Sequence, residues 1–106
     1  MTDERWIAGA TFVLVGPDGT RTPVQVQLAA PRSVGDDEWT CAVSVAGAFD
    51  EITPVSGADS LQALGLAWRL AGMLLASLEA GGRHLEFETG EAVPLAAYFG
   101  SPPAHP

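Results

Sequence analysis

A single long apolar run, DSLQALGLAWRLAGMLLASLEA at residues 59–80, occupies the middle of this chain. Its apolar residues recur every three to four positions, which predicts an amphipathic helix. Asp59 suits the N-cap and Gln62 suits the third helical position, so together they predict a capping box of the Asp type. Gly81 and Gly82 mark the end of the helix, because glycine readily adopts the left-handed conformation found there.

The predicted helix is apolar around more of its circumference than one contact requires. One stripe is expected to face the core, and its members are Leu61, Leu64, Trp68, Ala71, Leu74, Leu75 and Leu78. Leu66, Leu70 and Met73 extend the apolar arc beyond that stripe. A helix packed on one sheet needs an arc of only about 100° or somewhat more. We therefore expect the C-terminal segment 93–99, a second copy of the chain or another protein to cover these three side chains.

The segments around the helix alternate between apolar and polar residues, as β-strands do. Strands are expected at residues 6–15, 22–29, 39–46 and 84–88. The sequence GPDG at 16–19 predicts a hairpin between the first two. Residues 50–56 can form a further strand, which Pro54 would confine to a sheet edge because proline has no N–H group. The polar segment 31–38 is expected to be a loop.

These elements predict one α+β domain over residues 1–99. The expected architecture has two layers: an antiparallel sheet of four to five strands with one long helix packed on one face. The order along the chain is three strands, an optional fourth, the helix and a last strand. A chain of 106 residues can bury one core but not two. Residues 100–106, rich in proline, are expected to be a disordered tail.

The chain is acidic, with five Lys and Arg residues against thirteen Asp and Glu residues and a net charge of −8. Nucleic acids and anionic membrane surfaces bind clustered Lys or Arg, so neither is expected as a partner. A basic protein would instead be attracted. The densest acidic group is Asp36, Asp37 and Glu38. With Asp50 and Glu51 it would form one acidic rim, provided that both loops end at the same edge of the sheet; the alternative is a solvated loop that blunts a sheet end.

The expected compartment is the cytoplasm of a bacterium. Cys41 is the only cysteine, so the chain cannot form an internal disulfide. The N-terminus lacks the basic region of a signal peptide. The helix contains Gln62 and Arg69, which are unfavourable inside a membrane. Lys and Asn are absent while Ala, Gly and Pro abound, which indicates a GC-rich bacterial genome.

His84, Glu86 and Glu88 form the best candidate for a ligand or metal site. Strand alternation places all three on one face, with neighbours about 6.5–7 Å apart. One metal ion would therefore need a further ligand from an adjacent strand. The alternative is a solvated polar face. The sequence contains no nucleophile elbow, phosphate loop or dinucleotide fingerprint, so an enzyme is the least favoured class and no cofactor is expected.

A resemblance rests on two motifs, Trp39-Thr40-Cys41 in a strand and GADSLQAL at residues 57–64, which opens the helix. The chain resembles a small bacterial family of unknown function, in which a W-x-C strand is followed by a G-x-D-S-L-Q-A-L helix start. The resemblance covers about residues 39–80. It implies the strand core and the capped helix. In size and shape such proteins are similar to small immunity or accessory proteins of bacterial conflict systems.

Two classes of function remain open from the sequence. The leading hypothesis is a non-enzymatic protein-interaction module, immunity-like or accessory, or a homodimer. Its contact area would be the flank of Leu66, Leu70 and Met73 or the open sheet face, and the acidic loop 36–38 would attract a basic partner. The alternative is a domain that binds a small ligand or divalent metal on the open sheet face.

Overall fold

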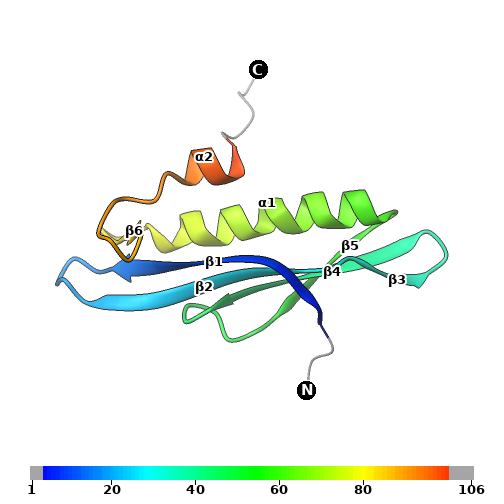
Figure 1. Cartoon of the computed structure of the whole chain (residues 1–106), viewed down its shortest axis with the longest axis horizontal. Coiled ribbons are helices and arrows are strands. Elements are labelled where there is room, and N and C mark those ends of the chain that lie inside the picture. Colours follow the sequence, from blue (N-terminus) through cyan, green and yellow to red (C-terminus); the bar gives the residue numbers. More distant parts are fainter. Residues whose placement is uncertain (1–3, 101–106) are drawn as a thin grey trace.

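An antiparallel sheet of six strands carries one long helix in the computed structural model, which describes residues 4–100 (Figure 1). The elements in chain order are β1 (Trp6–Val15), β2 (Arg21–Ala29), β3 (Arg32–Gly35), β4 (Glu38–Ala46), β5 (Thr53–Gly57), α1 (Ser60–Leu78), β6 (His84–Glu86) and α2 (Leu95–Phe99). The α+β class with one long helix on an antiparallel sheet is therefore confirmed. Of the tail expected at 100–106, all but Gly100 lies outside the described residues.

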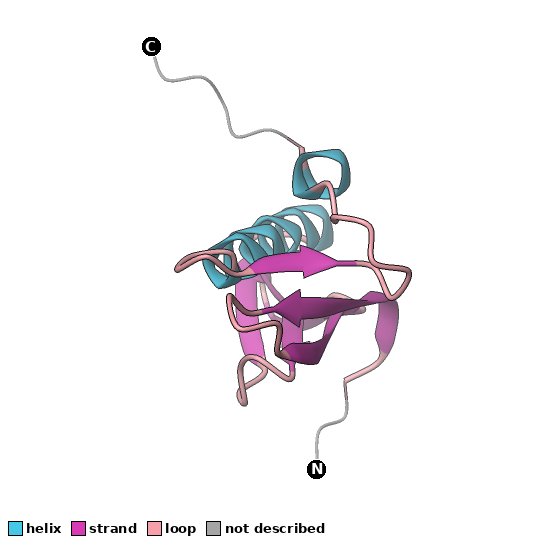
Figure 2. Ribbon diagram, turned by 90° about the vertical axis from the view of Figure 1, so that its left-hand side faces the viewer, coloured by secondary structure: helices cyan, strands magenta, loops and turns pink. Residues whose placement is uncertain are grey.

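The sheet is ordered β3-β4-β2-β1-β6, and β5 pairs with the other edge of β4. The short strand over residues 50–56 is thus present as β5, which includes Pro54 and lies at a sheet edge as expected. Figure 2 shows that the sheet curls beneath α1. The curled sheet and the helix form the two layers of the fold, and α1 packs on both β4 and β5.

The expectation of a loop at 31–38 was wrong, and the strand count is six because of it. β3 continues beyond β2 and pairs with β4, from Arg32 opposite Thr40 to Gly35 opposite Glu38. Asp37 closes the turn with a φ of 52°, a conformation that Asp tolerates better than most residues. All four residues of β3 are exposed. A strand exposed on both faces has no apolar alternation, so the pattern that marks other strands is missing here.

The core lies between the concave face of the sheet and a face of α1 that is richer in alanine than expected. The buried helix residues are Ala63, Ala67, Ala71, Leu75 and Leu78. Leu61, which was expected in the core, is 79% exposed, and Trp68 is also exposed. Alanine lets the helix axis lie close to the sheet, so the bulkier side chains are displaced to its flanks. Of the expected stripe, Ala71, Leu75 and Leu78 are thus confirmed as core residues, whereas Leu61 and Trp68 were wrong and Ala63 and Ala67 were missed.

The two ends of α1 are formed as the sequence predicts. The Asp59 carboxylate accepts a hydrogen bond from the Gln62 N–H at 2.8 Å, and the Gln62 side chain accepts one from the Ala58 N–H at 2.6 Å. The capping pair is confirmed, although Gln62 reaches the residue before the cap. Gly81 and Gly82, with φ of 69° and 81°, follow the helix. These local contacts fix where α1 begins and ends independently of the sheet.

Candidate functional site

The C-terminal helix α2 covers one flank of α1. The ring of Phe99 lies 4.5 Å from that of Trp68, measured between centroids. A side chain at Gly72 would place its Cβ 2.9 Å from Phe99 Cγ, so glycine is what permits this contact. Tyr98 lies against Phe12 on the sheet, with centroids 5.5 Å apart. The C-terminal segment thus folds back on the helix.

Segment 93–99 does not cover the side chains for which it was expected. Gly72 and Trp68 lie on the opposite flank of α1 from Leu66 and Met73, as the helical period of 3.6 residues requires. Leu66 remains 38% exposed and Met73 66% exposed, whereas Leu70 packs partly against the core. Both Leu66 and Met73 therefore keep apolar surface that is accessible to solvent among the described residues. We call Leu66, Leu70 and Met73 the helix flank.

Most of α1 faces solvent in this fold, although its residues are apolar. By length and composition alone Ser60–Leu78 could cross a membrane, a test that the core helix of a soluble protein also passes. Only 28% of its most apolar window is buried within the molecule. The alanine face meets the sheet and α2 covers a part of one side. The helix flank is the exposed apolar surface of α1 on the side away from α2.

The helix flank continues into a shallow cleft beside the loop that follows β4. The cleft has a volume of about 270 Å³, and its lining comprises Val43, Val45, Phe49, Asp50, Glu51, Thr53 and Leu74. Leu74 lies one helical turn after Leu70, so apolar surface runs from the flank to the exposed ring of Phe49. Two carboxylates, Asp50 and Glu51, border this surface. An apolar centre with an acidic border is therefore present on this side of the molecule.

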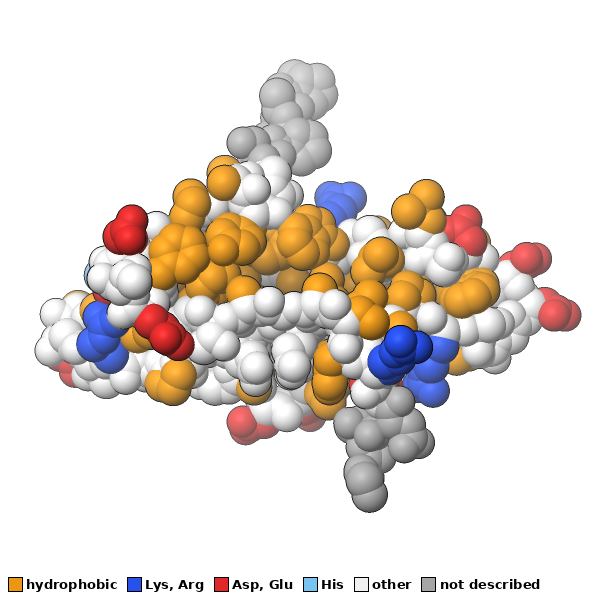
Figure 3. All heavy atoms as spheres, viewed as in Figure 1, with side chains coloured by type: hydrophobic (Ala, Val, Ile, Leu, Met, Phe, Trp, Pro, Cys, Tyr) orange, Lys and Arg blue, Asp and Glu red, His pale blue; other side chains and the backbone are white. Residues whose placement is uncertain are grey.

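The acidic residues do not form a single rim. Asp36 and Asp37 lie in the turn before β4 and Glu38 begins that strand, whereas Asp50 and Glu51 follow its other end. A strand of nine residues spans about 30 Å. Figure 3 shows acidic side chains at both ends of this face and at its lower edge, with hydrophobic side chains between the two ends. The condition that both loops end at one edge of the sheet is not met.

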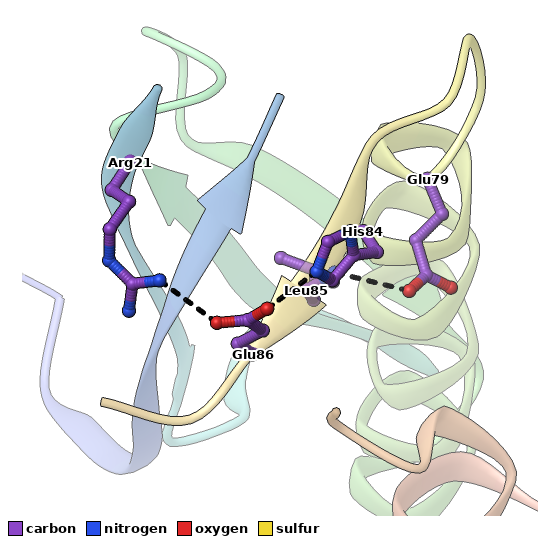
Figure 4. A network of polar contacts seen from close by, with 5 residues as sticks. All are labelled: Arg21, Glu79, His84, Leu85 and Glu86. Carbon is purple, nitrogen blue, oxygen red and sulfur yellow. Dashed lines mark hydrogen bonds and ion pairs between the residues drawn. The ribbon is translucent and has the colours of Figure 1, made fainter. Parts of the chain in front are cut away.

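The structure brings His84 and Glu86 together and adds Arg21, a residue that the sequence did not connect with them (Figure 4). Glu86 lies 2.6 Å from Nε2 of His84 and 2.9 Å from Nη1 of Arg21. The hydrogen bond with His84, and then that with Arg21, lowers the pKa of the Glu86 carboxyl below its usual value. Arg21 lies on β2 and reaches Glu86 across β1, a proximity that no spacing in the sequence reveals.

Glu88 does not join this cluster, because β6 ends at Glu86 and the chain turns there: the Phe87 N–H donates to the Glu91 carbonyl. Among residues 4–100, no group of three His, Cys, Asp or Glu side chains is arranged to hold a metal ion. On the helix side of β6, the Glu79 carboxylate accepts a hydrogen bond from the Leu85 N–H at 3.3 Å. The polar contacts of Figure 4 therefore tie β6 to β2 and to the end of α1.

Cys41 is buried in the sheet, where its thiol donates to the Ala29 carbonyl at 3.2 Å. Burial, and secondarily the charge of Glu4, raises the pKa of this thiol. A thiol that remains protonated is a poor nucleophile. Cys41 therefore acts as a small core residue.

An apolar groove that the sequence did not predict lies between β1, α1 and α2. Its volume is about 160 Å³, and its lining comprises Ala8, Gly9, Ala10, Phe12, Val26, Gln27, Leu28, Trp68, Ala71, Tyr98 and Phe99. The lining comes from three regions of the chain that are far apart in sequence. Only the folding back of α2 onto Trp68 completes it.

Comparison with known families places most of this fold in one of them. The family described as Domain of unknown function (DUF6968) matches residues 10–96, which run from β1 into α2. The comparisons with curated proteins and with solved structures found no match. The match covers most of the sheet and all of α1, and it leaves out Ala8, Gly9, Tyr98 and Phe99 of the groove. The chain therefore belongs to the DUF6968 family, whose function is unknown.

Proposed function

We propose that this protein is a non-enzymatic protein-interaction module that binds its partner through the helix flank. The observation that carries the proposal is the exposure of Leu66 and Met73 on a helix of which only 28% is buried. Methionine suits an adaptable contact surface because its side chain is flexible and polarisable. Contiguous exposed apolar surface on a small protein marks a site of association.

A basic protein is the partner that this surface fits best. Asp50 and Glu51 border the cleft next to the flank, and the whole chain carries a net charge of −8. Such a field raises the rate at which a cationic partner arrives, with less effect on the lifetime of the complex. The acidic loop 36–38 adds to the field from the far end of β4. An immunity-like protein that binds a basic toxin is one concrete form of this proposal.

The same proposal places the module in the cytoplasm of a bacterium, with neither nucleic acid nor a membrane as its partner. The absence of Lys and Asn and the single, buried Cys41 support this setting. The W-x-C strand and the G-x-D-S-L-Q-A-L helix start would then be marks of its family. Both have structural roles here, because Cys41 is a core residue and Asp59 caps α1.

Photo-crosslinking in cells tests the proposal. A benzophenone side chain is introduced at Met73 and, as a matched control, at Leu61, an equally exposed apolar position on a different side of α1. We expect one basic protein to be captured from position 73 and not from position 61. Leu66→Glu should abolish that capture without lowering the melting temperature.

Equal capture from both positions would contradict a specific contact at the helix flank. Capture of a second copy of the chain from position 73 would replace the basic partner with a homodimer.

A further inference from the structure

The strand β1 has a free edge over more than half of its length. β2 pairs with β1 from Trp6 to Val15, but β6 covers the other edge only from Val13 to Val15. No hydrogen bond from any other described segment reaches the backbone of residues 7–12 on that side. Ile7, Gly9 and Thr11 are all exposed.

The register shows which backbone groups point outward. Val13 lies opposite Pro23, which has no N–H group, and pairs with Glu86 on the other side. In an antiparallel ladder hydrogen-bonded and non-hydrogen-bonded pairs alternate. Ala8, Ala10 and Phe12 therefore hydrogen-bond to β2. The N–H and C=O groups of Gly9 and Thr11 consequently point to the free edge, whereas the bulge between Trp6 and Ala8 interrupts the alternation at Ile7.

The β-bulge of β1 lies at its N-terminal end, between Trp6 and Ala8, and the edge beyond it lacks the other features with which proteins usually prevent strand pairing. The segment 6–12, WIAGATF, contains no charged residue and no proline. Charged side chains, prolines and covering loops are the common protections of an edge strand. An uncharged edge with unpaired backbone groups at Gly9 and Thr11 can accept a further strand.

The apolar groove lies directly beside the free edge, on the helix side of the sheet. Ala8 and Ala10 of β1 form one wall, and Trp68 and Phe99 contribute another. In Figure 3 a band of hydrophobic side chains follows this boundary between β1 and the two helices. Its volume of about 160 Å³ is close to that of a cavity of about 150 Å³ that holds a benzene molecule. The groove can therefore receive one large aliphatic or aromatic side chain.

The geometry points to a peptide-binding site: an extended segment of a partner protein adds as a strand to the edge of β1 and inserts one bulky apolar side chain into the groove. Main-chain hydrogen bonds to Gly9 and Thr11 supply the register. Alternation along the strand sends every second side chain of the segment towards the groove. The net charge of −8 favours a segment with Lys or Arg at its ends.

A second copy of the chain fits this site less well than such a segment. If two β1 edges paired, the strand of the partner copy would present Ala8 and Ala10 to the groove. These methyl groups would leave most of the volume empty, and an unfilled apolar cavity weakens an interface. The charge of the chain also opposes self-association.

This inference rests on the proposed function only in that the partner is a protein. The edge of β1 and the groove share no residue with the helix flank. Variants of the two surfaces therefore separate the two proposals.

A library of random nonapeptides displayed on phage, panned on the immobilised full-length chain, tests the site. We expect enrichment of peptides with bulky apolar residues at alternate positions and with Lys or Arg. One enriched peptide, labelled with fluorescein, is then titrated by fluorescence anisotropy. Ala8→Phe fills the groove and should weaken binding about tenfold. Ala46→Phe, at an exposed alanine on the far face of the sheet, is its matched control and should change affinity less than about twofold.

The strand addition itself is tested through the backbone. Thr11→Pro removes an outward N–H group and should also weaken binding, whereas Thr11→Ser keeps that group and should not. Methylation of alternate backbone nitrogens of the peptide should abolish binding without any change to the protein. Leu66→Glu should leave the affinity unchanged.

Failure to enrich any peptide, or binding that Ala8→Phe and backbone methylation both leave intact, would overturn the proposal. Sedimentation showing a dimer that Thr11→Pro converts to a monomer would overturn it in favour of a second copy.

Discussion

At the scale of single residues, Gly72 decides where the C-terminal helix lies. Glycine is unfavourable inside a helix by about 1 kcal/mol relative to alanine. At Gly72 this cost is offset by the contact with Phe99, which a Cβ would meet at 2.9 Å. Gly65, two turns earlier, has open space around it. Both glycines thus lie inside α1 between apolar neighbours, but their surroundings in the fold differ.

Gly65→Ala should therefore raise the free energy of unfolding by about 1 kcal/mol, because it gains helix propensity without a clash. Gly72→Ala should give a smaller gain or a loss, since Phe99 must move. Urea unfolding of both variants measures the difference. Equal stabilisation by the two substitutions would show that Phe99 does not pack on Gly72.

Glu86 should make the stability depend on pH in the acid range. Its pKa is lowered below the ordinary value of 4.5 by His84 first and by Arg21 second. A carboxylate with a lowered folded-state pKa stabilises the protein fully above its unfolded pKa, and this contribution is lost as the pH falls through the folded pKa. The stability difference between the native chain and Glu86→Gln should therefore be constant above about pH 6 and shrink below pH 4.5.

Urea titrations between pH 3 and pH 7 measure this difference. His84→Ala removes the first of the two causes, so the pH dependence should weaken in that background. A difference that is equal at both ends of the range would contradict the role of the ion pairs.

The sequence indicated the pair of His84 and Glu86 because strand alternation puts alternate residues on one face. It could not indicate Arg21, which lies on a strand two places away in the sheet. The expectation for Glu88 failed to account for the turn after β6. Contacts across a sheet depend on strand order, which a single sequence does not contain.

At the scale of elements, α1 shows the limit of a hydrophobic pattern. Its period and its caps predicted the existence and the ends of the helix. The pattern identified only part of the side that meets the sheet, because apolar residues surround two-thirds of the helix: it included Ala71, Leu75 and Leu78 but not Ala63 and Ala67. The size of the side chains decided how the helix is turned about its axis. The small alanines face the sheet, whereas Leu61 is exposed.

Leu75→Ala should destabilise the protein by about 2–5 kcal/mol, because it leaves a cavity at a fully buried position. Leu61→Ala, the same substitution at a residue that is 79% exposed, should change the free energy of unfolding by less than about 0.5 kcal/mol. Thermal or urea unfolding compares them directly. A comparable loss at both positions would mean that Leu61 belongs to the core after all.

At the scale of the whole molecule, the charge of the described residues is predominantly negative and includes Asp50 and Glu51 at the border of the apolar cleft. Acidic groups lie at both ends of β4, and only a few of the thirteen carboxylates are paired within the described residues, by Arg21, Arg32 and His84. The unpaired carboxylates repel one another, which destabilises the compact state. The same negative field attracts a basic partner. The charge that lowers the stability of the free chain would therefore also favour the binding of that partner.

Raising the NaCl concentration from about 0.01 M to about 0.1 M shortens the Debye length from about 30 Å to about 10 Å. The screening of self-repulsion should raise the melting temperature by about 2–4 °C, equivalent to roughly 0.5–1 kcal/mol. Asp36→Asn with Asp37→Asn should show a smaller response, because two charges are gone. A melting temperature that falls with salt would mean that attractive ion pairs dominate.

The sequence by itself determined the elements of this protein: the hairpin, the alternating strands, the capped helix and the acidic surface. Each depends on residues close together in the chain, where backbone propensity, side-chain period and caps act directly. The tertiary structure alone decided that Ala63 and Ala67 join the face of α1 that meets the sheet, that α2 covers Trp68 and not Met73, and that β1 keeps a free edge beside a groove. These features arise between segments that are far apart in sequence, so their packing is settled only when the whole chain is folded.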